Sequence, residues 1–518
     1  MKQFIMVLFL GLALAGCIGD SEPELSPEEQ KQAEKAAAYP TWVLGKDGQV
    51  DASAYPGELP EFTMRYATDR ISGEPTVGIT RHGSLIYSAI DFDQGVAGQT
   101  QPFGAYLRSW DQGLTWDEVT PNQLNTVPNH PVTGDPYVHV DPDTGRIFIV
   151  DMLPSGACNS VSWSDNEGKS WSVPRHGACP LPVADHPTIF TGPGAGLLGT
   201  GNDLLGQYPN VVYLCSNQIA QAKCAYSLTG GLDWEPAVLV FPGVDPIGVD
   251  PSLNNLCSGF TSHGTTDRND GTVYIPRSLC GSPAISISTD GGMTYNWKYI
   301  FEEEQYQTEP GVHDTMVAVD KNGTLYYFWI GGSGATAYLA VSHDQGATFE
   351  EPINVTAPGV TAMRYPGIVA GEDGRIAFLY MGSDNPRGHD VGNGLDNETN
   401  RQIWENATWN AYIGYSLNAN AEEPVFAITT ANNVNEPLKR GECVDRCPGN
   451  GREGGPYDFL DIEMDPITGQ VFAALVDVCT GFCDEPGTKA GAPQRSFGAV
   501  GVQIGGTRLT DGTEYDRP

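Results

Sequence analysis

Lysine and arginine are scarce in this chain. Together they number 28, against 64 aspartates and glutamates in 518 residues, and the formal net charge is −36. Nucleic-acid binding requires a cationic surface, so the composition excludes nucleic acid as a partner. The excess of carboxylates favours solubility in a salty habitat, where dissolved ions screen self-repulsion. A second interpretation of the same carboxylates is a divalent cation bound at one of their clusters; no other cofactor is indicated.

Long apolar runs are also missing. The run at residues 4–14 is too short to span a membrane as a helix. It follows Lys2 and leads into Leu14-Ala15-Gly16-Cys17, which resembles the lipobox of prokaryotic lipoproteins. The resemblance implies a signal peptide over residues 1–16, a lipid anchor on Cys17 and an acidic tether over residues 17–55. We therefore expect an exported protein, anchored to the membrane by its lipid alone and facing the cell exterior or periplasm; the alternative is an ordinary signal peptide with a chance cysteine.

Cysteines are few, and without Cys17 ten remain. An even number of cysteines in an exported chain predicts disulfides. Six of the ten fall in close pairs: Cys158 and Cys179, Cys215 and Cys224, Cys257 and Cys280. The other four have C-x3-C spacing twice, so a zinc site is the alternative for them, and their connectivity stays open: Cys443, Cys447, Cys479 and Cys483.

One eight-residue pattern recurs along the chain: Ser, any residue, Asp, any residue, Gly, any residue, Thr and an aromatic residue. Complete copies span residues 109–116, 288–295 and 342–349. Looser copies span residues 164–171 and 227–234, and an eroded copy begins at Ser416. The Asp carboxylate can accept hydrogen bonds from loop N–H groups, and the Gly can adopt a backbone conformation that other residues avoid. The pattern therefore predicts a tight hairpin loop with a structural role.

This pattern resembles the Asp box of the sialidase-like and BNR-repeat families. Between the copies lies a second repeat, in which apolar residues alternate on both sides of a Gly turn, as in residues 74–87 and 135–148. Alternation of this kind predicts a hairpin of two inner strands, and the Asp-box hairpin supplies two outer strands. We expect an all-β chain folded as a β-propeller of four-stranded antiparallel blades over residues 56–510, with a tail at 511–518. Seven blades are favoured and six are the alternative, because sialidases have six; residues 62–66 are expected to close the ring.

The residues that begin the inner strands are the candidate functional positions. Alignment on the Gly turns places seven residues at one equivalent position facing the mouth of the central channel: Glu74, Asp135, His186, Ser262, Asp314, Tyr365 and Phe459. The residues before them are Gly73, Gly134, Asp185, Thr261, His313, Arg364 and Asp458. A structural repeat would keep one residue type there, whereas these are mostly ionisable and differ between blades. They predict either a ligand site or a solvated acidic funnel.

The family resemblance implies roles for some of these residues. Sialidases bind the substrate carboxylate with three Arg and use a Tyr nucleophile with an acid. The candidates here are Arg70, which stands in Arg-Ile-Ser and approximates the family's Arg-Ile-Pro, with Arg364, Tyr365 and Asp314. Arg277 is a further candidate arginine, Asp91 or Asp93 is a possible acid, and Tyr457 is an alternative to Tyr365. A cation would be held by Asp185, His186, His313 and Asp314, because imidazole and carboxylate ligands suit borderline divalent metals.

Two functions are therefore expected of a propeller with these residues. The first is recognition or hydrolysis of extracellular glycans, by a glycoside hydrolase of exo-sialidase type if the protein is an enzyme. The alternative is a non-catalytic propeller that binds a polymer or a protein partner at the channel mouth.

Overall fold

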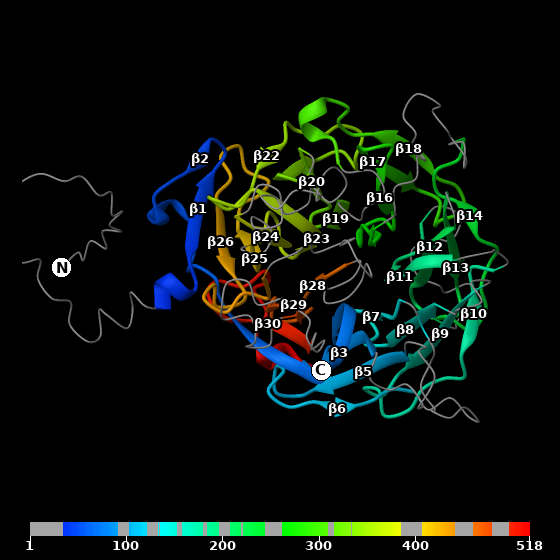
Figure 1. Cartoon of the computed structure of the whole chain (residues 1–518). Helices are drawn as coiled ribbons and strands as arrows, with labels where there is room; N and C mark the ends of the chain where they lie inside the picture. The colour runs from blue at the N-terminus through cyan, green and yellow to red at the C-terminus, as the bar shows by residue number, and fades with distance from the viewer. Residues whose placement is uncertain are drawn as a thin grey trace, which may run out of the picture.

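The computed structural model describes most of the chain. The described residues are 35–91, 103–121, 133, 135–152, 158–179, 184–195, 208–218, 221–243, 262–308, 315–332, 334–384, 407–440, 459–478 and 497–518. They form a ring of seven four-stranded antiparallel blades, with the first strand of each blade near the centre (Figure 1). The prediction of an all-β propeller is confirmed, and the count is seven rather than six.

The strands follow the same order in every blade, from the centre of the ring outward. Blade 1 contains residues 72–79 of β3 (Glu61–Ile79), β4 (Leu85–Asp91), β5 (Phe103–Ser109) and β6 (Asp117–Glu118), and blade 2 contains β7 (Tyr137–Val140), β8 (Ile147–Met152), β9 (Asn159–Ser164) and β10 (Arg175–Gly177). Blade 3 contains β11 (Ala184–Gly192), β12 (Val211–Gln218), β13 (Gln221–Ser227) and β14 (Val238–Leu239). Blade 4 contains β15 (Thr265–Thr266), β16 (Val273–Leu279), β17 (Ser282–Ser288) and β18 (Asn296–Tyr299). Blade 5 contains β19 (Thr315–Val319), β20 (Leu325–Gly331), β21 (Thr336–Ser342) and β22 (Ile353–Asn354). Blade 6 contains β23 (Ala362–Ala370), β24 (Ile376–Ser383), β25 (Thr408–Ser416) and β26 (Phe426–Thr430). Blade 7 contains β28 (Asp461–Met464), β29 (Val471–Asp477), β30 (Phe497–Gly505) and residues 61–71 of β3.

The long strand β3 closes the ring. Its first part is the outermost strand of blade 7, where Thr63 pairs with Val502 of β30. Its second part is the innermost strand of blade 1, where Thr76 pairs with Ser88 of β4. One strand therefore joins the two ends of the propeller, which confirms the closing role expected of residues 62–66.

Both ends of the described chain also pack on blades. Residues 41–49, which fall within the range expected for the tether, form β1 (Thr41–Gly45) and β2 (Gly48–Gln49), and β1 pairs with β26 of blade 6. Near the C-terminus, the Arg517 guanidinium pairs with Asp465 of blade 7 and donates to the Arg81 carbonyl of blade 1. No helix in the described part of the chain has the length and apolar character of a membrane span.

The core lies between neighbouring blades. Two fully buried tyrosines of second strands reach the preceding blade with their hydroxyls: Tyr87 donates to the Leu475 carbonyl at 3.2 Å, and Tyr327 to the Ala284 carbonyl at 2.9 Å. A buried hydroxyl with a partner avoids the free-energy penalty of an unpaired polar group. These bonds fix the packing of one blade on the next.

The Asp boxes are the hairpin loops between the third and fourth strands. In blade 4 the Asp290 carboxylate accepts hydrogen bonds from the Thr294 N–H at 2.9 Å and its hydroxyl at 2.6 Å, while the Ser288 hydroxyl accepts one from the Gly292 N–H at 2.9 Å. Asp111 and Asp344 make the same bonds, which lower the pKa of each carboxyl to about 2. The structural interpretation of the boxes is confirmed.

Two of the predicted disulfides are present. Cys158 bonds to Cys179, and Cys215 bonds to Cys224, its cross-strand neighbour on β13. The third pair includes Cys257, which lies outside the described residues. The four C-terminal cysteines lie outside them too, so their pairing stays a prediction.

Candidate functional site

Three of the inner strands carry a β-bulge at the same place. The ladder shifts between Gly73 and Thr76 in blade 1, between Asp185 and Thr188 in blade 3, and between Arg364 and Gly367 in blade 6. The bulges therefore put Glu74, His186 and Tyr365 at one equivalent position, as the alignment on the Gly turns predicted. Arg70 lies upstream of this position, in the part of β3 that crosses from blade 7 to blade 1.

The three bulged residues share an unusual backbone. Their φ angles are +50° for Glu74, +49° for His186 and +58° for Tyr365, and a proline follows each of them. A non-glycine residue in this region costs of order 1–3 kcal/mol, and such strain concentrates at functional sites. A bulge also changes the direction in which a side chain points. The strand start is therefore built to place three different side chains, all at least nine-tenths buried, at the same end of the ring.

Hydrogen bonds between blades hold these strand starts together. The His186 N–H donates to Asp135 of blade 2 at 2.8 Å, and the Val77 N–H of blade 1 donates to Asp461 of blade 7 at 3.0 Å. Asp135 was predicted as a ligand-binding residue, and the structure shows it supporting the backbone of the next blade. A carboxyl group that accepts a backbone N–H from the next blade is held in a fixed position beside the mouth.

Two buried arginines belong to the same half of their blades. Arg364, beside Tyr365, is 4% exposed and donates to the Met363 carbonyl at 3.3 Å. Arg277 lies on β16, 1% exposed, with its guanidinium 5.2 Å from the centre of the Phe241 ring. Burial lowers the pKa of Arg277 to about 10, so it remains a cation at neutral pH. Arg364 immediately precedes the bulged residue of blade 6, at the position that Gly73 occupies in blade 1 and Asp185 occupies in blade 3.

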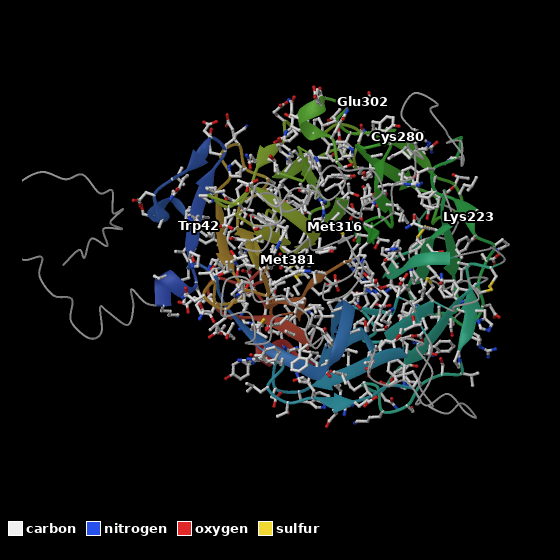
Figure 2. The ribbon with its side chains drawn as sticks, viewed as in Figure 1. Trp42, Lys223, Cys280, Glu302, Met316 and Met381 are labelled. Carbon is white, nitrogen blue, oxygen red and sulfur yellow. A yellow bond between two sulfur atoms is a disulfide. The ribbon has the colours of Figure 1, made fainter. Side chains whose placement is uncertain are left out.

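Aromatic rings form the floor of the mouth. The Phe459 ring of blade 7 lies 6.3 Å from His186 and 5.8 Å from His263, and Tyr137 of blade 2 meets His263 edge-on at 4.7 Å. A void of about 10 Å³ lies among them, lined by His186, Pro187, Thr188, Ser262, His263, Met316 and Phe459. Met316 of β19 lies near the centre of the ring (Figure 2).

The central channel continues below this floor as a cavity of about 200 Å³, lined by residues from all seven blades. Asp461 and Glu463 alternate on β28 and face it, and the Asp461 carboxylate lies 3.5 Å from Nδ1 of His263. Burial and the neighbouring Asp461 raise the pKa of Glu463, whereas burial lowers the pKa of His139. Sequence reasoning missed these residues; the available signal was two acidic residues at alternate positions of an inner strand.

Other predicted site residues lie outside the described part of the structure. His313, Asp314, Asp458 and Cys17 are not described, nor are the side chains of Arg70 and Asp185. The ligand set expected for a cation depends on them, so it stays a prediction. Within the described residues, no three His, Cys, Asp or Glu side chains are arranged to hold a metal ion.

Comparison with known proteins gives a partial match. No family model matches the chain. A sialidase of Bacteroides fragilis (strain YCH46) is 22% identical over 261 residues, which is 42% of this chain and 46% of that protein. The chain therefore spans less than half the length of this curated relative.

Solved structures with similar folds include the Hadza microbial sialidase Hz136, 17% identical with a TM-score of 0.39 over 61% of this chain and 64% of that one. The intramolecular trans-sialidase of Ruminococcus gnavus is 13% identical with a TM-score of 0.37, over 85% and 96%. The α-L-arabinanase of Penicillium chrysogenum is 12% identical with a TM-score of 0.39, over 74% and 99%. Similarity at this level identifies no substrate. Its blades and Asp-box hairpins make the chain a seven-bladed β-propeller, which is similar to a sialidase over part of its length.

Proposed function

We propose that this propeller recognises or hydrolyses extracellular glycans at the channel mouth. The observation that carries the proposal is the set of three bulges that hold Glu74, His186 and Tyr365 at one structural position. A ring of similar blades can form an asymmetric site only if equivalent positions hold different groups. A carboxyl, an imidazole and a phenol are such groups, and each occupies a backbone conformation that costs free energy to keep.

The proposed ligand is a sugar that carries a carboxylate. Arg364 stands beside Tyr365, and a guanidinium binds a carboxylate through two parallel hydrogen bonds. The curated relative is a sialidase, which supports this ligand class. If the protein is an enzyme, we propose an exo-sialidase type of glycoside hydrolase with Tyr365 as nucleophile, Arg70 and Arg364 on the carboxylate, and Asp314 as a further catalytic residue.

The test is an assay of the purified chain on sialylated oligosaccharides and their desialylated counterparts, measuring both released sugar and binding. Release of sialic acid would support the enzyme, and binding without release would support the non-catalytic alternative. Neither release nor binding across the panel would contradict the proposal.

A pair of tyrosine variants sharpens the assay. Tyr365→Phe removes the phenolic hydroxyl at the mouth and keeps the ring. We expect at least a tenfold loss of turnover or binding, about 1.4 kcal/mol. Tyr213→Phe is the matched control, because Tyr213 is fully buried on the second strand of blade 3, away from the strand starts. Equal losses in both variants would show a general effect on folding.

We also propose that the protein is exported and held at the membrane by a lipid on Cys17. The support is the sequence of residues 1–17. Cys17→Ser should move the protein from the membrane fraction to the soluble fraction. Membrane association of that variant equal to wild type would contradict the anchor.

A further inference from the structure

The small void at the floor of the mouth is lined in part by a buried hydroxyl that no other group of the described structure satisfies. The Ser262 side chain is 2% exposed, and its hydroxyl has no hydrogen-bond partner within the described structure. Leaving a buried hydroxyl unpaired costs about 1–3 kcal/mol. A native structure avoids this cost where a partner of the right size can enter.

The size of the void selects that partner. Its volume of about 10 Å³ is close to the space that one water molecule needs in a polar cavity. A buried water makes two to four hydrogen bonds. The lining offers that number, because Thr188 adds a second hydroxyl and His263 adds an imidazole ring beside Ser262.

We propose that the void holds one ordered water molecule, bound by Ser262 and by the polar groups of blades 3 and 4 around it. The water satisfies the Ser262 hydroxyl and joins the starts of the two blades directly beneath the mouth. His263 belongs to the walls of both the void and the central channel, and its Nδ1 faces Asp461 on the channel side. The water site therefore adjoins a residue that also lines the central channel.

The test is a crystal structure of the free protein at a resolution that shows ordered waters. We expect one density peak in the void, about 2.6–3.2 Å from the Ser262 Oγ. A void without density in wild type would overturn the proposal. This result needs no ligand, so it is independent of the glycan assays.

The variant Ser262→Ala removes the hydroxyl and keeps the void. We expect the peak to be lost or much weakened, together with a lower melting temperature. Ser286→Ala is the matched control: Ser286 is also fully buried in blade 4, but its hydroxyl already donates to the Val240 carbonyl. The control should lose stability and keep the peak. An unchanged peak in Ser262→Ala would show that Ser262 does not bind the water, and if that variant does not fold, the wild-type density decides.

Discussion

Two kinds of acidic residue in this chain differ in what surrounds them. In the Asp boxes, each carboxylate accepts hydrogen bonds from groups within its own eight-residue loop. At the strand starts, Asp135 and Asp461 accept backbone N–H groups from neighbouring blades. The first kind stabilises a hairpin, and the second kind connects blades around the channel.

The Asp boxes should therefore affect stability and leave the mouth intact. Asp290→Ala should destabilise the protein by about 1 kcal/mol, because the Thr294 N–H and hydroxyl lose their acceptor. Asp290→Asn should cost less, since Asn166 occupies the same position in blade 2 and accepts the Ser170 N–H at 2.9 Å. Thermal unfolding of the three proteins checks the order; a loss of glycan binding in Asp290→Ala without a change in melting temperature would contradict it.

The boxes were predictable from sequence because their hydrogen bonds are local. The pairing of His263 with Asp461 was not, because these residues lie on blades 4 and 7, and no spacing in the sequence brings them together. The role of Asp135 as an acceptor between blades could not be predicted either, because its partner is a backbone N–H of the next blade.

At the scale of one strand, the bulge is the feature that sets the mouth apart. The alignment on the Gly turns placed Glu74, His186 and Tyr365 at equivalent positions, and the ladder shifts confirm that alignment. Their left-handed backbone could not be predicted, because a residue before proline normally adopts an extended conformation. Tertiary packing overrides the local preference at these three positions.

Glycine should relieve this strain. Glu74→Gly should be more stable than Glu74→Ala by about 1 kcal/mol, since both variants remove the side chain and only glycine adopts a φ of +50° without steric cost. At Ser88 on the neighbouring strand β4, which is not among the residues with positive φ, alanine should be the more stable of the two. Denaturant unfolding measures both differences; alanine as the more stable substitution at position 74 would show that Glu74 is not strained.

At the scale of the whole ring, the channel gathers charges from several blades. Burial and the Asp461 carboxylate raise the pKa of Glu463 above its ordinary value of 4.5. A carboxyl whose pKa is raised by folding stabilises the native state below the ordinary value, and this contribution is lost as the pH rises through the higher folded value. Glu463 should therefore make the folded protein less stable as the pH rises above the ordinary pKa of a glutamate.

The variant Glu463→Gln should remove this pH dependence. Wild type should lose stability relative to the variant as the pH rises above about 4.5. Glu302→Gln is the control, because Glu302 is exposed on the outer rim of the ring (Figure 2). Thermal unfolding across a pH series measures the differences; parallel curves for wild type and Glu463→Gln would contradict the burial of this carboxyl.

We propose that glycans bind at the mouth and not at the opposite face, where the Asp boxes lie. The most direct measurement is a binding titration of the sialylated oligosaccharide panel against wild type, the double variant Glu74→Gln with Tyr365→Phe, and Asp290→Ala. We expect the mouth variant to fold and to lose at least tenfold in affinity, about 1.4 kcal/mol, while Asp290→Ala binds as wild type does. A folded mouth variant with wild-type affinity would contradict it.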